Sequence, residues 1–350
     1  MKELPIPQRL ILTDILKKFL KRHHPKHSEI DKDLAKRWAG YWGERALANY
    51  VKELPQEKYL IFHDLELQLN GIHFQIDTLL ICQNFVLIIE AKNISGTLYF
   101  DNVFNQLLRI NPDGTEESFE DPRVQCQRLH SLLRRWLVKN GLNMLPIDHL
   151  VFFKSANKTI LKSNPNIRAD FSKVCKGRDL FNKIEDCDRR YKQVKIDLEK
   201  INEIGKLILS QHSPKKINIL ETYGLLEKDI PSGVMCPNST CSQIPMDYKK
   251  GKWICPKCNT ISKNGHFEAL LVHFLLIKPT ITNTECQSFL HLPTKDITQK
   301  ILLSLNLQTT GQTKKRMYHQ WPNPESYFIL EENHIKPILC SKKVPPCVSP

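Results

Sequence analysis

Four cysteines in two closely spaced pairs constrain this chain more than any other feature of its sequence. Four residues separate Cys236 from Cys241, two separate Cys255 from Cys258, and thirteen lie between the pairs. Pairs at this spacing allow four thiolates to surround one Zn²⁺ tetrahedrally, which leaves no open position for catalysis. Because so small a segment cannot bury enough core to fold alone, the metal would supply its folding free energy. Residues 231–262 are therefore predicted to form a zinc ribbon with a structural Zn²⁺.

The other cysteines are scattered, and the total of 11 is odd. This distribution does not suggest a disulfide framework, so a reducing cytoplasm is the expected location. Residues 1–38 are predicted to form a basic helical segment. Its short apolar run is interrupted by Asp14 and followed by Lys17 and Lys18, which is not the pattern of a signal peptide.

The charge balance points to a polyanionic partner. The chain has 51 Lys and Arg against 37 Asp and Glu, which gives a formal net charge of +14. Such an excess favours nucleic acid, although a basic surface kept for solubility is the alternative. No apolar run is long enough to span a bilayer, so no membrane partner is expected. A length of 350 residues suggests two or three domains.

Residues 39–155 have the pattern of an α/β unit. A helix is expected near residues 37–51, followed by strands at 59–69, 74–82 and 85–92. The continuous apolar run from Val86 to Ile89 is typical of a strand that is buried on both faces. A hairpin at 97–110 and a helix at 121–139 complete the pattern, so the predicted class is α/β (α+β) with a mixed sheet flanked by helices.

Three charged residues lie in or next to these apolar strands. Asp77 lies within the second strand, and Glu90 and Lys92, two positions apart, share one face of the third. Hydrolysis of a phosphodiester needs carboxylates to hold a divalent metal and a cation to offset developing charge. The same residues are also compatible with a structural ion pair at a sheet edge.

Four short motifs follow one another between about residues 37 and 140. They are Gly40-x-x-Gly43-Glu44, Gln75-Ile76-Asp77, Ile89-Glu90-Ala91-Lys92-Asn93 with Gly96, and Asp121-Pro122-x-x-Gln125. Motifs in this order resemble the nuclease-related domain (NERD) family, which is placed within the PD-(D/E)xK restriction-endonuclease-like fold. Two positions depart from the family pattern without removing an expected ligand: Ile76 replaces a proline and Asp121 an asparagine.

The resemblance implies a role for five residues of this chain. Glu44 would approach the metal site from the first helix, and Asp77 and Glu90 would bind a catalytic Mg²⁺ or Mn²⁺. Lys92 would assist the attacking water or stabilise the charge of the transition state. Gln125 would orient the site or contact the phosphate. Catalysis is not a property of every member of the family.

The C-terminal part returns to helices at residues 263–335 and resembles a winged helix, with helices at 280–291 and 294–305 and a basic hairpin after them. A plain helical packing domain is the alternative. Five basic residues of this segment are expected to contact nucleic acid. They are Lys295, Lys300, Lys314, Lys315 and Arg316.

The remaining segments carry no recognisable chemistry. They are a basic, mixed helical extension at 156–230 and an irregular tail at 336–350. The favoured function is metal-dependent cleavage of DNA, in DNA processing or in defence. The alternatives are a non-catalytic nucleic-acid-binding or adaptor protein that retains the fold, and a transcription regulator that acts through the winged helix.

Overall fold

A computed structural model describes residues 2–21, 23–111, 113–142, 144–154, 159–163, 171–312, 315–322, 328–331 and 334–337. The chain divides into two compact units. The first unit comprises Met1–Pro7 and Ala35–Lys216, and the second comprises Gln8–Leu34 and Ile217–Pro350. The expected mixed α+β class is confirmed by the helices and mixed sheets of the protein.

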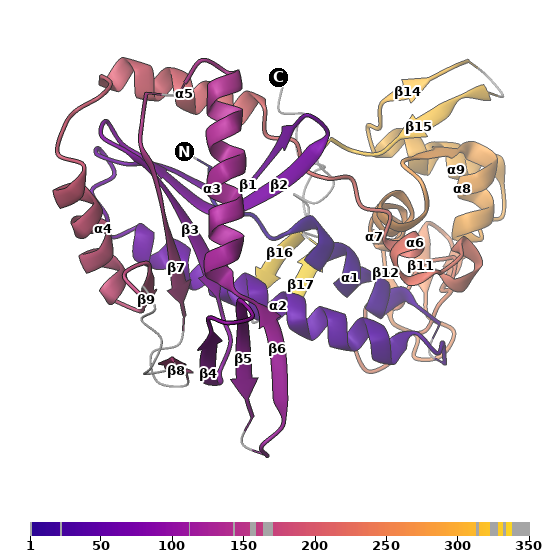
Figure 1. Cartoon of the computed structure of the whole chain (residues 1–350). Helices are drawn as coiled ribbons and strands as arrows, with labels where there is room; N and C mark the ends of the chain where they lie inside the picture. Colours follow the sequence, from indigo (N-terminus) through magenta and orange to yellow (C-terminus); the bar gives the residue numbers. More distant parts are fainter. Residues whose placement is uncertain are drawn as a thin grey trace. The chain divides into compact units, whose positions relative to one another are not determined.

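The first unit is a mixed sheet between two layers of helices (Figure 1). The sheet has the order β1-β2-β3-β7-β9; the first three strands are antiparallel, and β7 and β9 run parallel to β3. Its strands are β1 (Leu60–Leu69), β2 (Ile72–Ile81), β3 (Val86–Lys92), β7 (Ile147–Phe153) and β9 (Val174–Lys176). One face packs on α3 (Pro122–Lys139) and α5 (Leu198–Ser210). The other packs on α2 (His27–Val51) and α4 (Asp179–Arg190).

Strand β3 lies at the centre of this arrangement. Val86 and Ile88 pack on the side of α3 and α5, whereas Leu87 and Ile89 pack on the side of α2 and α4. Both faces are therefore covered, which explains the continuous apolar run. Since the side chains of a strand alternate, Glu90 follows Val86 and Ile88 on the α3 side.

Strands β1 and β2 share an irregularity at one level of the sheet. Across Asp64 the residues of β1 that face α3 change from even to odd positions, from Phe62 to Leu65. The same change occurs in β2 across Asp77, which the register places opposite Asp64. Asp64 has a φ of 48°, in the left-handed region. This kink breaks the regular alternation that an unperturbed strand would show.

A second, smaller sheet adjoins the N-terminal end of α3 in the first unit, with the order β6-β5-β4-β8. Its strands are β4 (Gly96–Asp101), β5 (Gln106–Ile110), β6 (Glu116–Glu120) and β8 (Thr159–Ser163). The predicted hairpin of β4 and β5 is confirmed by their antiparallel pairing. Asp121 caps α3 by accepting a hydrogen bond from the N–H of Arg123, and Pro122 is its first residue.

The second unit contains the cysteine cluster and the C-terminal helices. Its first elements are α1 (Gln8–Phe19), α6 (Ile219–Tyr223), a 3₁₀ turn η1 (Glu227–Asp229), and the sheet β10 (Asp247–Lys249), β11 (Lys252–Ile254) and β12 (Ile261–Ser262). The later helical elements are α7 (Gly265–Val272), a π-helical turn η2 (His273–Ile277), α8 (Asn283–Leu290) and α9 (Lys295–Ser304). The later strands are β13 (Thr280–Thr282), β14 (Thr309–Thr310), β15 (Met317–His319), β16 (Phe328–Glu331) and β17 (His334–Pro337).

Helices α8 and α9 fall within the predicted ranges. The hydroxyls of Thr282 and Thr294 cap them. Strands β13, β14 and β15 form a sheet in the order β13-β15-β14 next to these helices in the chain. The assignment of this segment as a winged helix stays a prediction. Most of the expected tail, from residue 338 onward, lies outside the described residues.

The predicted N-terminal segment, residues 1–38, is divided between the two units. The expected boundary at residue 38 falls inside α2, which is one continuous helix. Helix α1 belongs to the second unit, where it buries an apolar face that includes Leu12, Leu16 and Phe19. Lys18 pairs there with Glu268 at 2.6 Å. In the part of the chain that is described, no helix has the length and apolar character needed to cross a bilayer.

We predict that Asp148→Ala destabilises the first unit by about 2 kcal/mol, because it removes a buried carboxylate that accepts hydrogen bonds from two solvent-accessible cations, Lys173 and Arg190. Asp148 is 5% exposed and accepts hydrogen bonds from Lys173 at 2.5 Å and Arg190 at 2.7 Å. Burial alone would raise the pKa of Asp148, but these partners and the N–H of His149 hold it below 3.8.

The pH dependence follows from the sign of this shift. Since the folded pKa is depressed, the contribution of Asp148 is complete above its ordinary value and is lost as the pH falls below it. Urea unfolding at neutral and acidic pH measures both effects. Glu185→Ala, which removes one partner of an exposed pair with Arg189, is the control and should cause no measurable change. Equal stability of Asp148→Ala and wild type at neutral pH would contradict the prediction.

Candidate active site and metal centre

The carboxylates of Asp77 and Glu90 lie on adjacent strands at the same level of the sheet. The antiparallel ladder of β2 and β3 ends at the pair Thr78 and Ile89, and Asp77 and Glu90 are the next residues. Asp77 accepts a hydrogen bond from the N–H of Ala91 at 2.9 Å. Glu90 is only 3% exposed. The structure therefore brings together the two residues expected to bind a divalent metal.

Lys92 and Gln125 form a closed hydrogen-bonded group with Glu90. The ammonium of Lys92 donates to Oε1 of Glu90 at 2.7 Å and to Oε1 of Gln125 at 2.9 Å. The amide of Gln125 donates in turn to the same Glu90 oxygen at 2.7 Å. Gln125 lies in the first turns of α3, so this helix start is tied directly to the end of β3. Every member of the group fixes the orientation of the other two.

Glu44 approaches the same place from α2. A Cβ atom added to Gly43 would lie 3.0 Å from Cβ of Asn93, the residue after Lys92, whereas one added to Gly40 would meet nothing within 4 Å. Asn93 also donates from Nδ2 to the carbonyl of Ala39 in α2 at 2.7 Å. The absence of a side chain at Gly43 thus lets the helix that carries Glu44 lie against the end of β3.

The electrostatics of the site are those of crowded carboxylates. Burial, followed by the nearby carboxylates of Asp64 and Glu90, raises the pKa of Glu44 to about 7. Burial and the charges of Glu90 and Glu44 raise the pKa of Asp77 well above its usual value. Burial acts to lower the pKa of Lys92, but the Glu90 carboxylate outweighs it and raises that pKa. Lys92 therefore remains a cation near neutral pH.

Two buried oxygen atoms indicate that the site fits a hard divalent cation. Oε2 of Glu44 and Oε2 of Glu90 are buried and have no hydrogen-bond partner among the described residues. Unpaired carboxylate oxygens are costly in an apolar setting, and they are the ligands that Mg²⁺ and Mn²⁺ prefer. Among the described residues, the carboxylate oxygens of Glu44, Asp77 and Glu90 do not all lie within 4.8 Å of one another, whereas the sulfur atoms of four cysteines in the second unit do.

Two residues next to this site were not found by sequence reasoning. Asp64 is 9% exposed and accepts a hydrogen bond from Nε2 of Gln75 at 2.7 Å. Lys2 pairs its backbone with β1 and donates from Nζ to the carbonyls of His63 and Asp64, at 2.8 and 2.7 Å. It thereby stabilises the kink at Asp64. The strand of Asp64 also contains the polar residues His63, Glu66 and Gln68, so the sequence contains no distinct signal for Asp64, and it contains none for Lys2.

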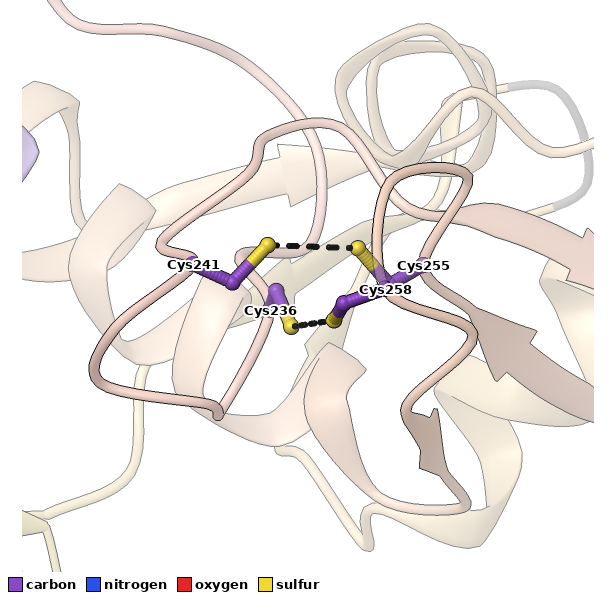
Figure 2. A group of neighbouring side chains, drawn as sticks. All are labelled: Cys236, Cys241, Cys255 and Cys258. Atoms are coloured by element: carbon purple, nitrogen blue, oxygen red, sulfur yellow. Dashed lines mark hydrogen bonds between the residues drawn. The ribbon is translucent and has the colours of Figure 1, made fainter.

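The four predicted cysteines of the second unit converge (Figure 2). Their sulfur atoms all lie within 4.8 Å of one another, with Cys236 and Cys258 3.6 Å apart and Cys241 and Cys255 3.7 Å apart. Zn–S bonds of about 2.3 Å in a tetrahedron place sulfur atoms roughly 3.8 Å apart, so the group fits one Zn²⁺. These separations are far longer than a disulfide bond of about 2.05 Å.

Local hydrogen bonds shape the two cysteine turns. The N–H of Cys241 donates to the carbonyl of Asn238 at 2.9 Å, and that of Asn259 donates to the carbonyl of Cys255 at 3.0 Å. The hydroxyl and N–H of Thr260 lower the pKa of Cys258 to about 6, whereas burial raises the pKa of Cys236 to about 12. Both turns are thus formed by the backbone, and the thiols point to one centre.

The basic residues expected to contact nucleic acid lie on the second unit. Lys295 and Lys300 are exposed on α9, Lys315 is exposed before β15, and Arg316 is partly exposed. Lys314 lies outside the described residues.

The mixed sheet with helices on both faces gives the first unit an α+β fold that is consistent with a nuclease-like domain. Residues 39–154, about a third of the chain, match the family model of the nuclease-related domain (NERD), the family that the motifs resemble. Neither the curated proteins nor the solved structures gave a match.

We predict that Gly43→Val impairs the candidate active site, because the added side chain must push α2 away from Asn93. Any catalytic activity of this site should fall at least tenfold, the order expected when a misplacement of about 1 Å disturbs a catalytic group. Gly40→Ala is the matched control in the same helix. It should retain activity and raise the free energy of unfolding by about 0.5–1 kcal/mol, because alanine favours helix. Full activity of Gly43→Val would contradict this packing argument.

We predict that the purified chain binds about one Zn²⁺ through its four cysteines. Cys255→Ser should remove most of the metal and lower the thermal stability of the second unit, since structural zinc supplies folding free energy. Metal content by mass spectrometry and thermal unfolding measure the two effects. Cys286→Ser, at a buried thiol outside the cluster, is the control and should keep its zinc. Zinc retained by Cys255→Ser at the wild-type level would contradict the assignment.

Proposed function

We propose that this protein is a nuclease that hydrolyses phosphodiester bonds in DNA with Mg²⁺ or Mn²⁺. The observation that carries the proposal is the group formed by Asp77, Glu90 and Lys92 at the end of a buried sheet. Glu44 and Gln125 extend it from two different helices. A structural ion pair does not by itself account for the buried, unpartnered oxygens of Glu44 and Glu90.

The carboxylates are suited to hold the cation. Glu90 has one oxygen engaged by Lys92 and Gln125 and a second that is unpartnered among the described residues. Asp77 is fixed by the N–H of Ala91. Burial and, after it, mutual repulsion raise the pKa values of Glu44 and Asp77, and a divalent cation here would offset both effects. When bound, Mg²⁺ or Mn²⁺ supplies Lewis-acid stabilisation of negative charge on the phosphate.

Lys92 acts in this proposal as a cation and not as a proton acceptor. Its raised pKa keeps the ammonium protonated near neutral pH. A fixed positive charge next to the scissile phosphate stabilises the charge that develops in the transition state. Gln125 holds this ammonium at 2.9 Å and so sets its direction. The basic residues Lys295 and Lys300 of α9 would bind the DNA backbone, with Zn²⁺ keeping the second unit folded.

A nuclease assay tests this proposal. Plasmid, linear duplex, single-stranded DNA and RNA are incubated with Mg²⁺, with Mn²⁺ and with EDTA. Wild type should cleave DNA in a metal-dependent manner. Asp77→Asn and Lys92→Met should each lower the rate by about 100-fold or more, the scale reported for loss of one charge-stabilising group. Glu116→Gln, which changes an exposed carboxylate of β6, should keep wild-type activity.

The alternative outcomes are distinct. Metal-independent binding of DNA without cleavage by wild type would favour a nucleic-acid-binding protein that retains the fold. Cleavage that survives in both Asp77→Asn and Lys92→Met would place the chemistry elsewhere. Preferred cleavage of RNA would change the substrate but keep the site.

A further inference from the structure

Helix α3 has a charge distribution unlike its neighbours. Its 18 residues contain no Asp or Glu. Five of them are basic, and they run from the first turn to the last. They are Arg123, Arg128, Arg134, Arg135 and Lys139. Surface helices commonly intersperse both signs, and like charges four residues apart destabilise a helix slightly. A helix with only one sign of charge therefore needs an explanation.

Most of these basic side chains have no anionic partner in the protein. Arg128, Arg134 and Arg135 are exposed, and none has an ion pair or hydrogen bond with the residues that the structure describes. Arg189 of α4, by contrast, pairs with Asp186 at 2.6 Å, and Lys200 of α5 pairs with Glu203 at 2.7 Å. The helix dipole favours cations only in the last turn, so it does not explain Arg128.

The exposed basic face begins beside the candidate active site. Gln125, which contacts Glu90 and Lys92, precedes Arg128 by less than one helical turn. With a rise of 1.5 Å per residue, Arg128 and Lys139 are about 16 Å apart along the helix. The helix lies across the outside of the central sheet, as Figure 1 shows. An extended polyanion at the active site could follow α3 over several phosphates.

We propose that the exposed face of α3, defined by Arg128, Arg134, Arg135 and Lys139, binds the sugar-phosphate backbone next to the scissile bond. The inference rests on the proposed nuclease function and adds the surface that holds its substrate. Arginine is well suited to phosphate, because its planar fork donates two parallel hydrogen bonds. The contacts would be to phosphates, so they would position the substrate without selecting a sequence.

The apolar side of α3 argues against an anionic membrane as the occupant. A helix that lies on a bilayer inserts an apolar face into it. The apolar residues of α3 are instead buried in the core of the first unit, including Leu129, Leu133 and Trp136. Val138, at 54% exposure, is the large apolar side chain of α3 that is exposed. The exposed face is thus basic and polar, as a phosphate-binding surface requires.

The test measures binding separately from cleavage. Binding of a labelled DNA duplex is followed by fluorescence anisotropy in EDTA across a series of salt concentrations. The triple variant Arg128→Gln/Arg134→Gln/Arg135→Gln should bind at least tenfold more weakly at low salt. The slope of log K against log salt should shrink by about 2 to 3, since each lost phosphate contact removes about 0.9. Thermal unfolding should show that the variant is folded.

A matched variant with the same change of charge controls for net charge. Arg178→Gln/Arg189→Gln/Lys192→Gln alters exposed residues around α4, on the opposite face of the sheet, and should bind like wild type. An equal loss in both variants, or an unchanged slope in the α3 variant, would overturn the proposal. The proposal would also be overturned if the α3 variant bound DNA like wild type but no longer bound phosphatidylserine vesicles. If the wild-type protein cleaves no nucleic acid but the α3 variant binds DNA more weakly than wild type, the nuclease proposal fails while the phosphate-binding surface is supported.

Discussion

The burial of Glu90 at the end of an apolar strand is the constraint on which the first unit depends. Strand β3 is covered by helices on both faces, so a charge at its end cannot be solvated as it would be on a surface. Lys92 and Gln125 offset part of that cost by donating one hydrogen bond each to Glu90, and a third hydrogen bond joins them to each other. Because Gln125 belongs to α3, satisfying Glu90 also fixes where this helix begins. The polar group thus links the sheet to the layer that covers it.

Much of this arrangement could be predicted because short-range patterns encode it. The four apolar residues before Glu90 indicated a strand covered on both sides, and β3 has those properties. The spacing of Glu90 and Lys92 placed them on one face, and their ion pair of 2.7 Å agrees. The cysteine spacing is equally local, and the four thiols meet. In each case the geometry of one strand or one tight turn is sufficient.

What could not be predicted depends on contacts that are distant in sequence or on unusual backbone. The kink at Asp64 needs a left-handed φ, which the residue type permits but does not require. Lys2 stabilises it from more than sixty residues away, and no periodicity records such a contact. Arg190 lies in the extension at 156–230, where the sequence shows no recognisable chemistry, and this exposed residue contacts the buried Asp148. No local sequence pattern indicates that α1 belongs to the second unit.

That assignment has a consequence for how the chain is made. Residues 8–34 belong with residues from 217 onward, and the whole nuclease-related domain is translated between them. Helix α1 therefore leaves the ribosome long before the partners that cover Leu12 and Leu16 exist. The first unit can fold while the apolar face of α1 is still exposed. Partly folded chains with exposed apolar surface aggregate or recruit chaperones. Because of this order of synthesis, the second unit finishes folding last. Its folding requires contacts between segments that are far apart in the sequence.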